Sequence, residues 1–333
     1  MNYGYVKVAA AVPRVKVADC KFNASEIEKE IIIADGKGVQ IIAFPELCIT
    51  GYTCGDLFAQ QLLLEEAEMG LIQILNNTRQ MDIISILGMP VALNGVLLNA
   101  AVVIQKGRVL GVVPKTYLPN YKEFYEKRWF TSACDVAENS VRLCGQIIPM
   151  GRDLLFETAD TTFGVEICED LWAPCPPSTY LAQEGANIIL NLSASNEMIG
   201  KSEYRRSLVL NQSARLISGY IYCSAGEGES TQDLVFSGHN IIAENGATLV
   251  ESELFSNDYV ISEIDVNKLA FERRKNTSFR NDKCDTETIW FDIPLTDTKI
   301  TRFVSRTPFI PYSADAVSYT HIRAHETGRN LVC

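Results

Sequence analysis

The sequence contains little histidine: three of its 333 residues, which are His239, His321 and His325. Catalytic units that pair a serine or cysteine with histidine need an imidazole in the folded body of the protein. Two of the three histidines lie near the C-terminus, in a segment without an apolar period. Only His239 is left for the body, and we expect it to be a hydrogen-bonded structural residue. A nucleophilic enzyme with this sequence therefore needs a base other than histidine.

Long apolar runs and clusters of basic residues are also lacking. No run reaches the roughly 18–20 apolar residues that span a bilayer, and the N-terminus alternates like a strand rather than a signal peptide. Acidic residues outnumber basic ones by 41 to 30, which gives a formal charge of −11. This balance lacks the electrostatic attraction on which binding to nucleic acid depends. We expect a cytoplasmic protein that binds neither nucleic acid nor membranes.

Metal-ligand spacing is absent although the sequence has ten cysteines. No CxxC pair occurs, and cysteines such as Cys48 and Cys168 stand in apolar stretches. A chain of this length builds its own core and does not need disulfides for stability. We therefore predict that most cysteines are buried free thiols and that the chain has no metal site.

The order of apolar patterns predicts an α/β protein. Asn23, with Glu26 three residues later, is typical of a capping box and predicts a helix start, while Asp56 is expected to cap a long helix that continues to about residue 80. Hairpins are predicted at Lys106-Gly107 and Asn245-Gly246. Further helices are expected at about 178–185 and 201–218. Strands are predicted at 6–12, 39–44, 83–88, 97–105, 109–113, 162–167, 187–192, 221–224 and 240–243.

Three of the predicted strands run directly into a residue with reactive chemistry: Glu46, Lys115 and Cys168. Ligands of α/β sheets bind at the carboxyl ends of the strands, so these side chains are expected to meet. Each residue alone does not indicate an active site, because a Glu or Lys at a strand end is usually solvated and a cysteine is usually a small buried hydrophobic residue. Together they supply a thiol, a base and a cation without histidine.

The sequences around these residues resemble the carbon-nitrogen hydrolase (nitrilase) superfamily, in the strings FPELxxxGY, KxxLP and ICEDLW. Longer strings are similar to the glutamine amidotransferase domain of glutamine-dependent NAD synthetases, over about residues 4–312: KTYLPNYKEFYEKRWF, ICEDLW, NLSASNEMIGKSEYRR and FSGHNII. The resemblance implies a four-layer αββα sandwich of the α/β class. It also implies a glutaminase that releases ammonia from glutamine through a cysteine thioester.

The resemblance assigns roles to individual positions. It implies that Glu46 is the general base, that Lys115 is the cation beside the oxyanion, and that Cys168 is the nucleophile. Some members of the family carry arginine where this chain has Lys201. Lysine keeps the positive charge but cannot make the two parallel hydrogen bonds that arginine makes to a carboxylate. We therefore expect a lower affinity for glutamine and an unchanged reaction. No cofactor is implied for the glutaminase step, and ATP and Mg²⁺ belong to the synthetase domain of the family. The implied substrate-binding residues are Tyr121, Ser195, Lys201 and Glu169, with Glu126 as an accessory carboxylate.

The C-terminal end differs in kind from the rest. From Val317 the string VSYTHIRAHETGRNLVC has no usable apolar period and is similar to translated adapter sequence, so we expect one domain over 1–312 and a non-native tail over 313–333. A natural disordered tail is the alternative. The family's SGGxDS loop for ATP does not occur, which predicts that the chain holds only the ammonia-generating half. The family implies a synthetase domain as partner and a homo-oligomer when complete.

Two other functions stay open at this point. One is a stand-alone amidase or carbamoylase of the same superfamily that acts on another small amide. The other is a non-catalytic interaction module that keeps only the fold. Loss of Glu46, Lys115 or Cys168 would be typical of such a module, and all three are present.

Overall fold

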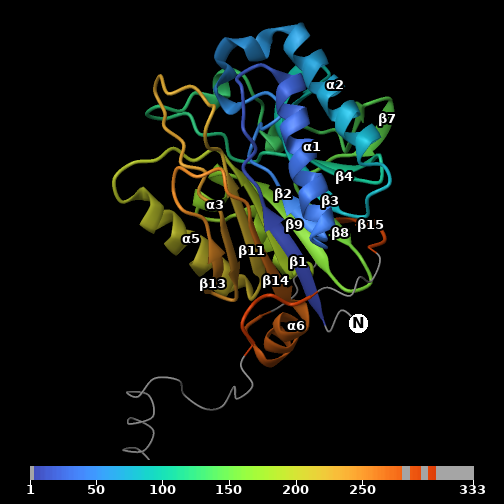
Figure 1. The fold of residues 1–333 in the computed structure, drawn as a ribbon, viewed down its shortest axis with the longest axis vertical. Coiled ribbons are helices and arrows are strands. Elements are labelled where there is room, and N and C mark those ends of the chain that lie inside the picture. The colour runs from blue at the N-terminus through green and yellow to red at the C-terminus, as the bar shows by residue number, and fades with distance from the viewer. Residues whose placement is uncertain (1–3, 280–285, 294–298, 305–333) are drawn as a thin grey trace, which may run out of the picture. The chain divides into compact units, whose positions relative to one another are not determined.

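Two β-sheets form the centre of the computed structural model, which describes residues 4–279, 286–293 and 299–304 (Figure 1). The first sheet has the spatial order β14 (Val260–Asp265), β1 (Tyr5–Ala10), β2 (Ile41–Ala43), β3 (Ile84–Leu93), β4 (Val96–Gln105) and β5 (Arg108–Pro114). The second has the order β13 (Ala247–Glu251), β12 (Ile241–Glu244), β11 (Gly219–Ser224), β10 (Ile188–Ser193), β9 (Thr162–Ile167), β8 (Leu154–Glu157) and β15 (Glu287–Trp290). A separate hairpin pairs β6 (Ser140–Leu143) with β7 (Gln146–Pro149).

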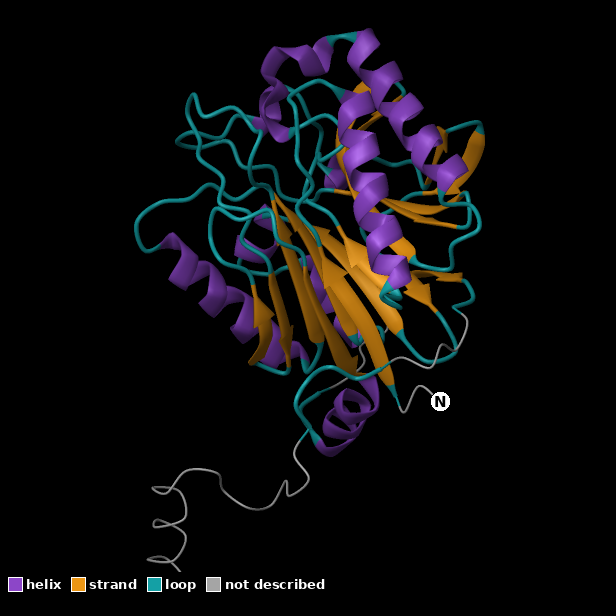
Figure 2. Cartoon of the chain, in the orientation of Figure 1, coloured by secondary structure: helices purple, strands orange, loops and turns teal. Residues whose placement is uncertain are grey.

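Each sheet has a parallel centre. Strands β1, β2 and β3 are parallel in the first sheet, and β9, β10 and β11 are parallel in the second. The remaining neighbours are antiparallel, except that β15 pairs in parallel with β8. Because the carboxyl ends of parallel strands share one edge, the loops after β2, β9 and β10 leave from two such edges. Figure 2 shows loops gathered at one end of the strands.

Helices cover the outer face of each sheet. The helices α1 (Cys20–Gly36) and α2 (Gln61–Asn77) share one buried cluster with residues of the first sheet. The helices α4 (Pro177–Gln183) and α5 (Lys201–Leu216) share another with residues of the second sheet. The short α3 (Glu169–Trp172) follows β9, and α6 (Val266–Lys275) follows β14. This arrangement confirms the αββα layers and the α/β class expected from the sequence.

Between the sheets lies a third apolar cluster. Val8 and Ile86 of the first sheet belong to it, as do Val165 and Leu190 of the second, and all four are at most 1% exposed. Burying apolar side chains of this size is worth roughly 1.5–3 kcal/mol each, so the cluster fixes one sheet against the other. The strand ends that face the site are therefore held on a rigid base.

The predicted strands and hairpins agree with the structure, but two helix starts were wrong. The cap of α1 is Asp19, whose carboxylate accepts a hydrogen bond from the Phe22 N–H at 3.1 Å. Asn23 lies inside the helix, where its side chain donates to the carbonyls of Lys16 and Ile49. A buried amide needs such partners, and here they tie the loop after β2 to α1.

The second wrong start concerns Asp56. It lies in a 3₁₀ segment, η1 (Tyr52–Ala59), and α2 begins only at Gln61. Its carboxylate instead accepts hydrogen bonds from Arg128 at 2.7 Å and from the indole of Trp129 at 2.9 Å. Asp56 thus binds a charged partner instead of capping a helix, and this contact fastens η1 to η2 (Glu126–Arg128) and to the residue after it. A further 3₁₀ turn, η3 (Ala133–Asp135), follows η2 along the chain.

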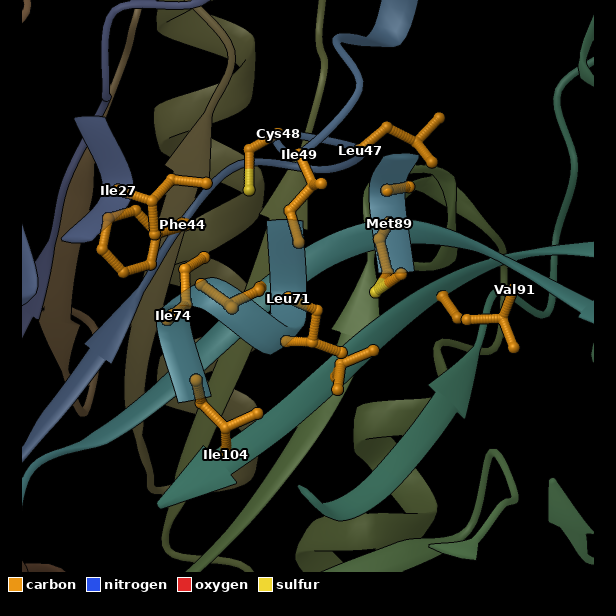
Figure 3. Packing of buried hydrophobic residues seen from close by; sticks show 14 of the residues in the cluster. Ile27, Phe44, Leu47, Cys48, Ile49, Leu71, Ile74, Met89, Val91 and Ile104 are labelled. Carbon is orange, nitrogen blue, oxygen red and sulfur yellow. The ribbon is translucent and has the colours of Figure 1, made fainter. Parts of the chain in front are cut away.

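The loop after β2 is built into the core rather than exposed. Figure 3 shows Phe44, Leu47, Cys48 and Ile49 in one cluster with residues of α2 and β3, and all four are at most 1% exposed. Loops normally run over the surface because their backbone groups need water. This one is exceptional because neighbouring segments supply its partners, and the residue it carries, Glu46, is consequently held in place.

The cysteines of the described residues are unpaired and most are buried, as predicted. No described helix combines the length and the apolar character that a bilayer crossing requires. The chain divides into a unit up to Ile300 and a second unit, Thr301–Cys333, of which the structure describes residues 301–304. The predicted tail over 313–333 lies outside the described residues, so its assignment stays a prediction.

Candidate active site

The structure brings Glu46, Lys115 and Cys168 to one place from both sheets. Glu46 follows β2, Lys115 follows β5, and Cys168 follows β9. The Lys115 ammonium lies 2.6 Å from a Glu46 carboxylate oxygen, and both groups act electrostatically on the Cys168 thiol. The Glu46 N–H also donates to the Ser193 carbonyl at 3.3 Å, which joins the two sheets beside the site. The three residues expected to react are therefore neighbours.

Lys115 is a fully buried cation between two carboxylates. Its Nζ donates to an oxygen of Glu46 and to an oxygen of Glu126, each at 2.6 Å. Burial lowers the pKa of an ammonium, but the charges of Glu126 and Glu46 outweigh it and hold the pKa of Lys115 well above its ordinary value. Lys115 is thus permanently charged. An ammonium has three N–H donors, so one remains for a ligand.

Glu126, expected only as an accessory group, is an integral part of this cluster. One of its oxygens accepts hydrogen bonds from Lys115 and from the Tyr52 hydroxyl, the latter at 2.8 Å. Burial raises the pKa of Glu126 to about 7, with the nearby charge of Glu46 adding to the rise and Lys115 opposing it. Burial thus favours the protonated carboxyl of Glu126 and the charge of Lys115 favours its carboxylate, so the two effects oppose each other.

Asn99, in β4, was missed by the sequence analysis. Its side-chain N–H donates to Glu46 Oε1 at 2.6 Å and contacts Glu126 at 3.4 Å. Glu46 Oε1 is thereby occupied by Asn99 and Lys115, whereas Glu46 Oε2 is buried and has no hydrogen-bond partner among the described residues. A buried carboxylate oxygen left open in this way is poised to take a proton. The signal in the sequence was one amide inside the apolar run LLNAAVV.

Cys168 sits at a strained turn between β9 and α3. Its backbone angles are φ 46° and ψ −98°, a combination that residues other than glycine rarely adopt. The Cys168 N–H donates to Asn191 Oδ1 at 3.2 Å. Burial raises the pKa of the Cys168 thiol, and the negative charge of Glu46 raises it further. The resting group is therefore a thiol that needs a base to become a nucleophile. Strain at this position is typical of a side chain held toward a ligand.

Asp170 fixes the distance between Cys168 and Lys115, and the sequence analysis did not single it out. Its carboxylate accepts hydrogen bonds from the N–H groups of Tyr117 at 2.8 Å, Ile167 at 2.9 Å and Thr116 at 3.2 Å. Two of these groups follow Lys115 and the third precedes Cys168. One buried side chain thus joins the end of β5 to the end of β9.

A pocket of about 370 Å³ opens onto Cys168. This volume is suited to a small molecule. Every residue expected to bind substrate contributes to its wall, namely Tyr121, Glu169, Ser195 and Lys201, together with the apolar side chains of Phe124 and Trp172. The structure therefore gathers the predicted binding residues around the predicted nucleophile.

Charged groups of both signs line this pocket. The Tyr121 hydroxyl donates to the Glu169 carboxylate at 2.9 Å and 3.0 Å, and burial raises the pKa of Glu169. Lys201, the first residue of α5, donates to Asn196 and lies over the ring of Trp172 at 5.3 Å, and burial lowers its pKa. An anion and a cation in one small pocket fit a ligand that carries both an ammonium and a carboxylate group.

The turn that carries Glu46 depends on Gly88, in β3. A Cβ on Gly88 would lie 2.2 Å from the Leu47 nitrogen and 2.5 Å from the Pro45 carbonyl oxygen, which are backbone atoms that cannot rotate away. We expect Gly88→Ala to displace this turn, to lower the free energy of unfolding by about 1–3 kcal/mol and to reduce turnover at least tenfold. Chemical denaturation and steady-state kinetics measure the two effects.

Gly36→Ala is the matched control, because a Cβ there meets no atom within 4 Å. It is the last residue of α1, where alanine is the better helix former, so we expect the free energy of unfolding to stay the same or to rise by up to about 1 kcal/mol and turnover to stay at its wild-type value. Equal effects of the two substitutions would contradict the role given to Gly88.

A family model described as carbon-nitrogen hydrolase matches residues 7–274 of the chain. Among curated proteins, the glutamine-dependent NAD(+) synthetase of Mycobacterium tuberculosis strain H37Rv is 37% identical over 324 residues, which cover 93% of this chain and 48% of that protein. The enzyme of the same name from Rattus norvegicus is 32% identical over 265 residues, covering 77% of this chain and 36% of that protein. The chain thus spans half or less of the length of these relatives.

Solved structures show the same fold. A glutamine-dependent NAD(+) synthetase from Cytophaga hutchinsonii matches with a TM-score of 0.70 and 29% identity, over 83% of this chain and 46% of that one. A carbon-nitrogen hydrolase from Helicobacter pylori G27 matches with a TM-score of 0.67 over 83% of this chain and 94% of that one. Its identity of 17% carries the fold alone.

Proposed function

Because the chain belongs to the carbon-nitrogen hydrolase family, we propose that it hydrolyses the side-chain amide of L-glutamine through a thioester on Cys168. The observation that carries this proposal is the pocket beside Cys168, which offers Glu169 to an ammonium group and Lys201 to a carboxylate. Free glutamine presents both groups at the end opposite its amide. The homology to glutamine-dependent NAD(+) synthetases supports the same substrate.

In the proposed first step, Glu46 takes the proton of the Cys168 thiol through its open Oε2 as the sulfur attacks the amide carbon. Negative charge then develops on the amide oxygen. The third N–H of Lys115 and the backbone N–H of Glu169 stabilise it, the latter because the first turn of a helix leaves its N–H groups without intrahelical acceptors. Glu46 returns its proton to the departing nitrogen, so ammonia leaves and a thioester remains.

In the proposed second step, a water molecule enters where ammonia left. Glu46 accepts one of its protons as the oxygen attacks the thioester carbon, and the same N–H donors stabilise the second oxyanion. The carbon–sulfur bond breaks, the Cys168 sulfur regains its proton, and glutamate is released. Lys115 keeps its proton throughout because Glu126 still pairs with it while Glu46 holds a proton.

The wider context is also a proposal. We infer that the ammonia serves glutamine-dependent NAD synthesis on a synthetase domain, where ATP and Mg²⁺ act, and that the glutaminase step itself needs no cofactor. A homo-oligomer is the expected assembly when this partner domain is present. The relatives described above are glutamine-dependent NAD(+) synthetases, which supports this context.

Substrate comparison tests the proposed function. Butyramide has the side-chain amide of glutamine and its carbon atoms as far as Cα, but it lacks the ammonium and carboxylate groups. We expect the purified chain to release ammonia from L-glutamine with a kcat/KM at least about 100-fold above that for butyramide, because contacts with charged groups are worth about 1.5–3 kcal/mol each. Glu169→Gln should reduce kcat/KM for glutamine about tenfold or more and leave the value for butyramide nearly unchanged.

Two results would replace the proposal with one of its alternatives. Equal kcat/KM values for glutamine and butyramide would identify a general amidase, and turnover of a carbamoyl compound in place of glutamine would identify a carbamoylase. A folded protein that hydrolyses no amide would be an interaction module.

A further inference from the structure

A buried charge cluster lies behind the wall of the pocket, and the mechanism above does not use it. Its centre is Arg205, on α5, whose side chain is fully buried. Its Nη1 donates to Glu197 Oε2 at 3.0 Å, and its Nη2 donates to the Asn196 carbonyl at 3.1 Å and to Ser195 Oγ at 3.3 Å. A single guanidinium therefore contacts three consecutive residues of the segment that follows β10.

This segment carries part of the substrate-binding wall. Ser195 lines the pocket directly. The Asn196 side chain accepts a hydrogen bond from Lys201 and donates one to Glu123 at 2.5 Å, so Asn196 sets where Lys201 lies. Arg205 thus acts on one wall residue directly and on a second through Asn196.

His239 orients Arg205. Its Nδ1 lies 2.8 Å from Arg205 Nη1, and its Nε2 lies 2.6 Å from Glu251 Oε1. Because a guanidinium only donates, Nδ1 must be the acceptor, and the imidazole proton must lie on Nε2 and point at Glu251. His239 is therefore held as one neutral tautomer, and the hydrogen-bonded structural role expected for it agrees with the contacts.

We propose that Arg205, oriented by His239 and Glu197, is a positioning residue that sets the affinity of the pocket for the charged end of its substrate. This inference rests on the proposed function, because it concerns how the pocket holds glutamine. Arg205 does not touch the reacting atoms. Replacing Arg205 should therefore raise KM and change kcat much less. The reason is that binding of the remote end of the substrate weakens equally in the ground state and in the transition state.

A matched pair of substitutions on α5 tests the role of Arg205. Lysine keeps the charge but donates from a single point and cannot reach Ser195, Asn196 and Glu197 together. We expect Arg205→Lys to raise KM for glutamine about tenfold and to change kcat less than about threefold. Arg215→Lys makes the same exchange at an exposed position on the same helix and should leave both constants at their wild-type values.

A second pair tests His239 in case Arg205 variants do not fold. Asparagine can place an oxygen near the position of Nδ1 and accept from Arg205, whereas leucine cannot. We expect His239→Leu to raise KM about tenfold and His239→Asn to stay within about threefold of wild type. A KM unchanged in Arg205→Lys and His239→Leu, or a fall in kcat with KM unchanged, would overturn the proposal.

Crystal structures separate this proposal from the proposed function. Wild-type turnover of glutamine tests the function and is independent of the variants. If the wild type hydrolyses no glutamine, structures of wild type and of His239→Leu still decide about Arg205. Loss of the contact between Arg205 and the Asn196 carbonyl in the variant, with displacement of Ser195, is the expected result, and an unmoved segment would overturn the proposal.

Discussion

Cys168→Ala is expected to abolish glutamine hydrolysis, with kcat reduced by a factor on the order of 10⁴ or more, because among the described residues that line the pocket only Cys168 carries a thiol. The substitution removes one sulfur atom from a buried site and leaves the walls of the pocket intact, so glutamine should still bind. Glutamate release measures turnover, and calorimetric titration measures binding. Cys134→Ala, at an exposed cysteine, is the matched control and should keep wild-type kinetics.

Glu46→Gln extends this test, because it leaves the thiol in place but removes its base. Residues that act as one unit are not additive, so the double variant with Cys168→Ala should be about as inactive as either single variant. Glutamate release that survives Cys168→Ala would contradict the assignment of the nucleophile.

Lys115→Met is expected to destabilise the fold as well as to abolish activity. It leaves the carboxyl groups of Glu46 and Glu126 buried without their cation, and removal of one partner from a buried ion pair costs roughly 3–5 kcal/mol. Both effects come from one atom, Nζ, which holds the two carboxylates in the resting site and stabilises the oxyanion in the reaction. Chemical denaturation and glutaminase kinetics measure them separately.

The loss of stability in Lys115→Met should depend on pH. Burial raises the pKa of the Glu126 carboxyl to about 7 while Lys115 opposes the rise, so without Lys115 folding favours the protonated form of this carboxyl more strongly. Its contribution to stability is then complete below the unfolded pKa and is lost as pH rises through the folded pKa. The stability difference between Lys115→Met and wild type should therefore be larger at pH 8 than at pH 5.

Two variants act as controls for Lys115→Met. Lys106→Met removes a lysine whose pair with Asp82 is about half exposed, and it should cost no more than about 1 kcal/mol. Adding Glu126→Gln to Lys115→Met removes one of the stranded charges and should recover part of the lost stability. An equal loss in Lys106→Met and Lys115→Met would contradict the importance assigned to the buried cluster.

The sequence allowed the layers, and the meeting of Glu46, Lys115 and Cys168, to be predicted because these depend on local patterns. Strands β9 and β10 are apolar runs whose ends can be read within a residue or so, and polar residues directly after such runs must emerge at the sheet edge. Glu46, Lys115 and Cys168 follow that rule. The resemblance to a known family then supplied Tyr121, which stands in a loop, and Lys201, the first residue of α5, and neither residue follows such a pattern.

The remaining parts of the site depend on contacts between distant segments. Asn99 meets Glu46 across 53 positions, and Asp170 meets Tyr117 across 53 positions, so no local pattern marks either pair. The same reason explains the two wrong helix starts. Asn23 and Asp56 have the chemistry of caps, but a loop carbonyl and a guanidinium from elsewhere in the chain bind them instead.

The role of Arg205 behind the pocket wall could not be predicted from the sequence, for a different physical reason. Arg205 lies on a helix that is otherwise rich in polar residues, and an arginine there is usually solvated. Only the packing of α5 on the second sheet shows that this side chain is buried and that it contacts Ser195 and Asn196. Burial of a charge was the decisive fact, and it is a property of the assembled layers.

We propose that Cys168 carries a thioester during turnover. The most direct measurement mixes the wild-type protein with L-glutamine, quenches the mixture in acid within one turnover, and determines the masses of its proteolytic peptides. We expect one additional glutamyl group on the peptide that contains Cys168, and no addition in Cys168→Ala. Steady glutamate release without any adduct on that peptide, or an adduct on a different residue, would contradict it.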